Sequence, residues 1–164
     1  MKESSGNRDE FVRTYGGIYE HSPWVAAEAH AIVSASCSLE ELANIFAGIV
    51  DGADYKRKLA LIRAHPDLAG RAALRGELTD DSTSEQSSAG IDQCSPAEYE
   101  QFQAYNERYW AKFGFPFVMA VRESNRAEIL AAFAARLEND HDTEFATAIA
   151  EIHKIARLRL QAMR

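Results

Sequence analysis

The sequence has few of the features that mark redox, nucleic-acid or membrane proteins. Its two cysteines, Cys37 and Cys94, fit no metal or redox spacing, so a reduced cytosolic setting is the default. No dense run of lysine and arginine is present, and the formal net charge of −7 argues against a general nucleic-acid binder. No apolar run approaches the roughly 20 residues that span a bilayer.

Sequence motifs for cofactors and targeting are also missing. There is no glycine-rich phosphate loop, and His65 and Asp67 have no partners at metal-ligand spacing. We therefore predict no metal and no cofactor. The first residues lack the apolar core of a signal peptide, and Gln161-Ala162-Met163-Arg164 is no recognised peroxisomal address, so we expect a cytoplasmic protein.

The composition is that of an ordinary globular protein. Of 164 residues, 46% are hydrophobic and 26% are charged, and no Pro/Gly/Ser-rich linker divides the chain. We predict one domain over residues 1–164. Helical periodicity dominates and no credible sheet is visible, so the predicted class is all-α, a bundle of about seven or eight helices.

Start and stop residues set the expected helix boundaries. Hydroxyl, Asx and glycine residues at these boundaries predict helices over 9–15, from Pro23 with Ser22 as N-cap, from Ser38 to Gly52, 54–64, 82–89 with Ser82 as cap, from Ser95-Pro96 to Gly114, 125–137 after Ser124, and from Asp142 or Thr143 nearly to Met163. Pro66 disfavours helix at His65. We expect residues 66–81 to be irregular or to carry one helical turn, and 118–121 to be a buried extended segment.

His65 is the first candidate functional residue. It follows the end of a predicted helix, where the negative end of the dipole favours the protonated imidazolium. Such a histidine could donate a proton near neutral pH. The alternative is a histidine with no function beyond surface or core packing.

Ser82-Thr83-Ser84-Glu85-Gln86 is the second candidate. Ser82 and Glu85 have the spacing of a capping box, which would make both residues structural. A helix N-terminus also offers amides to an anionic ligand, and the Gln86 amide can donate and accept toward a urea-like group. These two interpretations are compatible.

Arg159 is the third candidate. On the last helix it lies close to the centre of an apolar stripe formed by Phe145, Ile149, Ile152, Ala156 and Met163, whereas Lys154 and Arg157 lie outside that stripe. A buried arginine needs an anionic partner because an unpaired buried charge is costly. The partner is either a protein carboxylate or a bound anion, and periodicity does not decide between them.

Gly114-Phe115-Pro116-Phe117 is the fourth candidate. A turn is the simplest interpretation. A backbone segment with free amides beside aromatic side chains could also bind a flat heterocycle.

Together these segments resemble the 2-oxo-4-hydroxy-4-carboxy-5-ureidoimidazoline (OHCU) decarboxylases of urate breakdown. The resemblance spans nearly the whole chain in the family's order. It rests on Tyr19-Glu20-His21-Ser22-Pro23-Trp24-Val25-Ala26, Ala64-His65-Pro66-Asp67-Leu68-Ala69-Gly70, Leu78-Thr79 with Ser82-x-x-Glu85-Gln86, Ala89-Gly90, Lys112-Phe113-Gly114-Phe115-Pro116-Phe117-Val118 and Leu158-Arg159-Leu160.

The resemblance implies an all-helical, cofactor-free and usually dimeric decarboxylase that acts on a small molecule and yields S-allantoin. It makes His65 the catalytic acid and Glu85 its partner. It also implies that the substrate is contacted by Pro66, Ser82, Thr83, Ser84, Glu85, Gln86, Arg159 and the segment Phe117, Val118, Met119, Ala120 and Val121. The substrate itself supplies the electron sink for decarboxylation, which explains why no cofactor motif is needed.

Two alternatives come from other functional classes. The basic stretch Tyr55–Leu61 followed by His65-Pro66-Asp67 resembles the J-domain of co-chaperones, but it lacks the lysine-rich continuation after Asp67. A helical ligand-binding protein without catalysis is the other alternative. Turnover of the unstable substrate would separate the decarboxylase from both.

Overall fold

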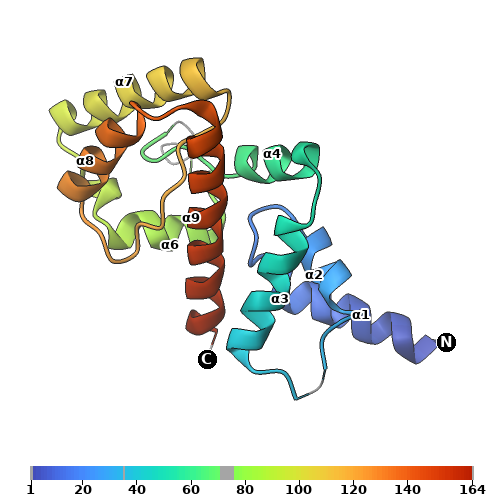
Figure 1. Ribbon diagram of the computed structural model, residues 1–164. Helices are drawn as coiled ribbons and strands as arrows, with labels where there is room; N and C mark the ends of the chain where they lie inside the picture. The colour runs from blue at the N-terminus through green and yellow to red at the C-terminus, as the bar shows by residue number, and fades with distance from the viewer. Residues whose placement is uncertain (1, 35, 71–75, 164) are drawn as a thin grey trace. The chain divides into compact units, whose positions relative to one another are not determined.

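The computed structural model describes residues 2–34, 36–70 and 76–163, with no side-chain description for residues 2–6. Within these ranges the chain forms eight α-helices and one 3-10 turn, and no strand is found there (Figure 1). The helices are α1 (Lys2–Tyr15), α2 (Trp24–Ala29), α3 (Leu39–Asp51), α4 (Tyr55–Arg63), α6 (Asp80–Ser88), α7 (Pro96–Phe113), α8 (Arg126–Arg136) and α9 (His141–Ala162), with the turn η1 at Ile91–Gln93. The all-α prediction is confirmed.

The chain divides into two compact units. One consists of Met1–Ala64 with His153–Arg164, and the other of His65–Ile152, so α9 contributes to both. The prediction of a single domain over residues 1–164 stays a prediction. None of the described helices combines the length and the apolar character needed to cross a bilayer.

In the first unit, α2 packs against both α1 and α3. The ring of Phe46 from α3 is almost fully buried and meets the edges of Phe11 and Tyr19. At the start of α3, Ser38 Oγ accepts the Glu41 amide at 3.1 Å, and the Glu41 carboxylate accepts the Ser38 amide at 2.7 Å. The helix start predicted at Ser38 is confirmed, and these two bonds form a capping box.

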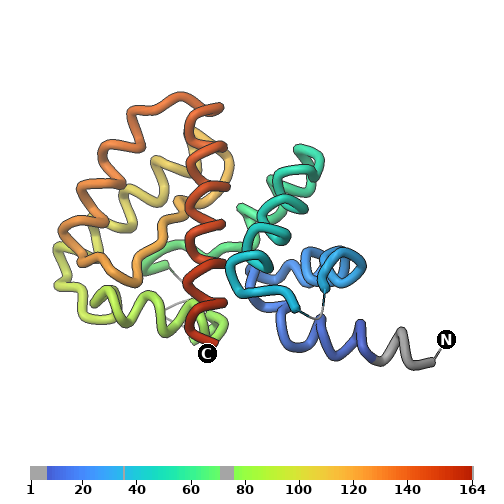
Figure 2. The backbone as a smooth tube through the Cα atoms, turned by 60° about the horizontal axis from the view of Figure 1, so that its bottom comes forward, coloured from blue at the N-terminus to red at the C-terminus, as the bar shows by residue number. Residues whose placement is uncertain are grey.

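In the second unit, aromatic side chains form the core. Phe117 stacks on Phe133 with ring centroids 3.9 Å apart, and Tyr109 of α7 meets Phe117 edge-on. Gly114 ends α7 as predicted, with a left-handed φ of 77°. The residues after Gly114 form the extended segment that leads to α8. Figure 2 shows that the backbone of this segment makes no helical turn.

Three predicted N-caps are wrong, the first two at α2 and α6. Ser22 does not cap α2: Pro23 already has helical dihedrals, and Ser22 Oγ donates to the Glu20 carbonyl. Ser82 does not cap α6 either, because the Thr79 hydroxyl accepts the Ser82 amide at 3.2 Å. Thr79 is also a good capping residue, and the acidic residues that follow it suit the positive end of the helix dipole.

The first helix, predicted over residues 9–15, begins seven residues earlier at Lys2, because the added residues are polar or glycine and carry no apolar periodicity. The other boundaries differ by one or two residues. Asn125 rather than Ser124 caps α8, since its side chain accepts the Glu128 amide. The last helix begins at His141, and the Asp140 carboxylate accepts the Thr143 amide. In the predicted irregular stretch 66–81, residues 71–75 lie outside the described part, and α6 occupies its last two residues.

Candidate active site

His65 lies in a short loop directly after α4. The helix ends at Arg63 with Ala64 as C-cap, as the following Pro66 predicts. The His65 side chain is buried, with 7% of its surface exposed. It lines a pocket of about 610 Å³ together with residues of its own loop and of α7. The members of the wall are His65, Pro66, Asp67, Gly70, Gln103, Asn106, Glu107 and Trp110.

Side chains of α7 hold the loop that follows His65. Gln103 Nε2 donates to the Ala69 carbonyl at 2.6 Å, and Asn106 Nδ2 donates to the Leu68 carbonyl at 3.0 Å. Trp110 Nε1 donates to Asp67 Oδ1 at 3.0 Å. The three donors, Gln103, Asn106 and Trp110, recur at helical spacing, which is the one pattern that could have revealed them. The sequence analysis missed their role because the loop they bind has no pattern of its own.

The loop itself is tight and strained. Ala69 has a φ of 53°, in the left-handed region that side chains rarely adopt. Gly70 approaches Asp67 so closely that a Cβ at position 70 would lie 2.7 Å from the Asp67 Cβ. Burial raises the pKa of the Asp67 carboxyl, and the hydrogen bond from Trp110 lowers it in part.

The helix α6 presents two of its candidate residues to the interior. Ser82 and Gln86 are buried one turn apart, Glu85 is half-buried, and Thr83 and Ser84 are exposed. Gln86 Oε1 accepts the Ala69 amide at 3.2 Å, and its Nε2 lies 3.5 Å from the Asp67 carbonyl. Since Thr79 is the N-cap, Ser82 and Glu85 do not form a capping box, and that structural interpretation of the pair is wrong.

The segment 117–121 is held by a buried charge pair. Phe117, Val118 and Val121 are buried, whereas Met119 and Ala120 are half-buried. Arg136 Nη1 donates to the Val118 carbonyl at 2.6 Å, and the guanidinium lies 4.3 Å from the centre of the Phe117 ring. This arginine fixes one main-chain carbonyl of the segment.

The partner of Arg136 is Glu144, which is fully buried. Its carboxylate lies 2.9 Å from Arg136 Nη2 and also accepts hydrogen bonds from Asn139 Nδ2 and the Tyr109 hydroxyl. Burial and the hydrogen bond to Glu144 raise the pKa of Tyr109. The burial of Arg136 and Glu144 was not predicted, because charged residues at the end of one helix and the start of the next give no local sign of burial.

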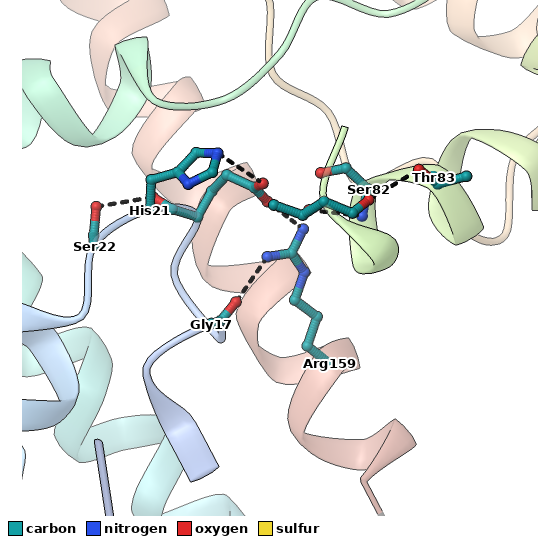
Figure 3. A network of polar contacts seen from close by, with 8 residues as sticks. Gly17, His21, Ser22, Ser82, Thr83 and Arg159 are labelled. Atoms are coloured by element: carbon teal, nitrogen blue, oxygen red, sulfur yellow. Dashed lines mark hydrogen bonds and ion pairs between the residues drawn. The ribbon is translucent and has the colours of Figure 1, made fainter. Parts of the chain in front are cut away.

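Arg159 has a protein partner in the first unit. Its Nη2 lies 2.6 Å from Glu20 Oε2, and its Nη1 donates to the Gly17 carbonyl at 3.0 Å, the contact drawn in Figure 3. Both charged side chains are almost fully buried. Of the two partners left open by periodicity, a protein carboxylate is present. The predicted burial of Arg159 is confirmed.

The burial of the other residues of the stripe on α9 agrees with the prediction, with one exception. Ile149, Ile152 and Ala156 are buried, Phe145 is half-buried, and Lys154 and Arg157 are exposed. Met163 is 47% exposed, so its assignment to the apolar stripe is wrong. It lies one residue beyond the end of α9, where helical periodicity no longer fixes the direction of a side chain.

The arrangement brings general acid–base and hydrogen-bonding groups into one unit. His65, Pro66, residues 82–86 and residues 117–121 all belong to unit His65–Ile152, whereas Arg159 belongs to the other unit. An imidazole, a carboxylate and an amide can together move one proton and hold polar ligand atoms. The part of the chain that the structure describes contains no group of three or more His, Cys, Asp or Glu residues able to hold a metal ion.

Comparisons with known proteins give a consistent result over most of the chain. A family model described as OHCU decarboxylase matches residues 4–161. A 2-oxo-4-hydroxy-4-carboxy-5-ureidoimidazoline decarboxylase of Haloferax volcanii is 47% identical over 152 residues, covering 93% of this chain and 88% of the relative.

Two solved structures are similar in fold. A crystal structure of (S)-allantoin synthase aligns with a TM-score of 0.70 at 34% identity, covering 94% of this chain and 50% of that one. A crystal structure of OHCU decarboxylase in the presence of (S)-allantoin aligns with a TM-score of 0.69 at 25% identity, covering 85% and 89% of the two chains.

Proposed function

We propose, from the premise that the chain belongs to the OHCU decarboxylase family, that it converts OHCU to S-allantoin and carbon dioxide. It is a carboxy-lyase, and its reaction is the last step from urate to allantoin. The observation that carries this conclusion is the match of the family model to residues 4–161. The co-chaperone alternative rested on a short stretch around His65-Pro66-Asp67, so it leaves most of that match unexplained.

The chemistry needs little beyond proton transfer and orientation. One ring carbon of OHCU carries both a carboxylate and a hydroxyl group and adjoins an imine carbon. When the bond to the carboxylate breaks, its electron pair forms a double bond to the imine carbon, and the imine nitrogen takes a proton. The resulting enol is then protonated at the former imine carbon as its hydroxyl becomes a carbonyl. Protonation from one face sets the stereocentre.

His65 is the proposed proton donor, and Glu85 is its proposed partner. A histidine is suited to this step because its pKa lies close to neutral pH, and a fixed ring protonates only one face. The burial of His65 in the wall of a pocket supports the proposal, because burial fixes the position of the ring and keeps competing water away from it.

The other proposed contacts hold the substrate. Amide and hydroxyl groups suit the ureido and ring oxygens, and an arginine fork suits a carboxylate. We assign these contacts to Pro66, Ser82, Thr83, Ser84, Gln86, the segment 117–121 and Arg159. Exposed Thr83 and Ser84 have the weakest support of this set, whereas buried Ser82 and Gln86 have the strongest.

Four further properties belong to the same proposal. We propose a cytoplasmic homodimer in which residues 1–164 act as one domain without a cofactor. The continuous match of the family model across both compact units supports the single domain. The composition and the family resemblance support the rest.

The test supplies freshly generated OHCU to purified protein after treatment with a metal chelator. We expect the circular dichroism of S-allantoin to develop faster than in a protein-free reaction, which gives racemic allantoin. Product that forms at the protein-free rate and without handedness would reject the proposed function.

A further inference from the structure

The loop after His65 is clamped by two glutamines from different helices. We infer that Gln103 and Gln86 are positioning residues that hold Ala69 in its left-handed conformation and thereby fix the His65 loop for proton transfer. This inference rests on the proposed function, since it takes His65 as the proton donor. It adds a residue of α7, Gln103, to a site otherwise built from the His65 loop, α6 and the segment 117–121.

Both main-chain groups of Ala69 are bound by glutamine side chains. The Ala69 amide donates to Gln86 Oε1 of α6 at 3.2 Å, and the Ala69 carbonyl accepts from Gln103 Nε2 of α7 at 2.6 Å. The two bonds hold the peptide groups on either side of the Ala69 Cα, so together they restrict both dihedral angles of Ala69. Ala69 is 5% exposed, so water does not readily replace either partner.

Alanine rarely adopts the backbone conformation that this clamp holds. Its φ of 53° brings Cβ close to the following carbonyl oxygen, and such residues persist only where their surroundings over-determine them. Strained residues of this kind cluster at functional sites. The left-handed φ of Ala69, together with the hydrogen bonds that maintain it, therefore indicates a role in the neighbouring site.

The rest of the loop transmits this constraint toward His65. Leu68 is tied to Asn106 and Asp67 to Trp110, so each residue from Ala69 back to Asp67 is held by α7. Pro66 has a fixed φ and directly follows His65. Few backbone torsions between Ala69 and His65 are therefore free to absorb a change in the backbone of Ala69 before it reaches the imidazole.

The orientation of Asn106 shows that the donor side of this stripe is the important one. Asn106 is 4% exposed, and among the residues that the structure describes its buried Oδ1 has no hydrogen-bond partner, while its Nδ2 donates to Leu68. An unsatisfied buried acceptor carries a cost. The amide nevertheless keeps the orientation in which it donates, because the Leu68 carbonyl has to be satisfied.

The test compares Gln103→Met with Gln101→Met on the same helix. Methionine keeps the length of glutamine and removes its amide. Gln101 is exposed and its side chain meets Tyr105, not the loop, so it is a matched control. We expect Gln103→Met to lower kcat by roughly 10- to 100-fold with KM within about threefold, as a misplaced group does. Its allantoin, corrected for background, should have a smaller excess of the S form, because a loosened imidazole protonates both faces.

A second readout does not depend on turnover. Amide hydrogen exchange of residues 67–70 should be faster by at least about tenfold in Gln103→Met and unchanged in Gln101→Met. Wild-type kcat and S excess in a folded Gln103→Met protein would overturn the inference. If the wild-type protein lacked activity, the proposed function would fail, and unchanged exchange in Gln103→Met would still overturn the clamp. Ala69→Gly keeps both hydrogen bonds to the backbone and makes the left-handed conformation easier to adopt. Added to Gln103→Met, it should restore part of the lost kcat and S excess, whereas no restoration would contradict a role for the held conformation.

Discussion

Replacing Glu144 by glutamine should strongly destabilise unit His65–Ile152. Glu144 is fully buried, and its carboxylate lies 2.9 Å from Arg136 Nη2. At an effective dielectric constant of about 20, two unit charges at that separation attract by roughly 6 kcal/mol. The neutral amide loses this attraction and leaves the guanidinium buried without a counter-charge. Since breaking a buried pair typically costs about 3–5 kcal/mol, we expect Glu144→Gln to lower the free energy of unfolding by that amount.

Urea denaturation followed by circular dichroism measures this loss. The matched control is Glu138→Gln, because Glu138 is exposed and lies between the same two helices. Exposed substitutions usually change stability by no more than about 0.5 kcal/mol. The double variant Glu144→Gln with Arg136→Met should recover part of the loss, because no unpaired charge remains in it. A loss below about 1 kcal/mol in Glu144→Gln would refute the reasoning that this pair is buried and mutually dependent.

Two further substitutions test the charges near the proposed site. Because burial raises the folded pKa of Asp67, its ionised form is disfavoured in the fold, so the wild type loses stability as pH rises above the ordinary value near 3.8. Asp67→Asn should therefore be the more stable protein at neutral pH, and the difference in melting temperature should vanish below that value; a constant difference would contradict this. Arg159→Met should lose several kcal/mol of unfolding free energy, because the almost fully buried Glu20 carboxylate loses the guanidinium that lies 2.6 Å from it. Adding Glu20→Gln should restore stability, and turnover that stays low in that folded double variant would support Arg159 as a substrate contact, whereas full turnover would oppose it.

The helix boundaries were predictable where the residues that determine them lie close together in the sequence. Ser38-x-x-Glu41 and Ser95-x-x-Glu98 contain both halves of their capping boxes, and both boxes form. Pro66 acts on the residue directly before it, so the end of α4 could be placed correctly. In each case the interacting groups are within a few positions of one another.

The errors at Ser82 and Ser124 have a different cause. Several residues near these helix starts can cap, and the choice depends on where the preceding chain comes from. Thr79 rather than Ser82 caps α6, and Asn125 rather than Ser124 caps α8, although both members of each pair have hydroxyl or amide side chains that can cap a helix. Short-range propensity ranks such candidates too closely to separate them.

The hydrogen bonds that build the candidate site could not be predicted from the sequence. Gln103 meets Ala69, and Arg136 meets Val118, only because two distant segments fold together. A glutamine on a helix gives no local sign that it will hold a strained loop. For Arg159 periodicity did predict burial, since burial follows from the face of the helix, but the identity of its partner Glu20 depends on the tertiary structure.

The most direct test of the central claim is the handedness of allantoin made by His65→Asn from fresh OHCU. The claim is that one fixed imidazole, His65, delivers the proton to one face of the enol. We expect this variant to keep the circular dichroism spectrum of the folded protein and to lose roughly 10²–10⁴-fold in rate, with product that is essentially racemic. A folded variant that still makes S-allantoin at a rate near that of the wild type would contradict the claim.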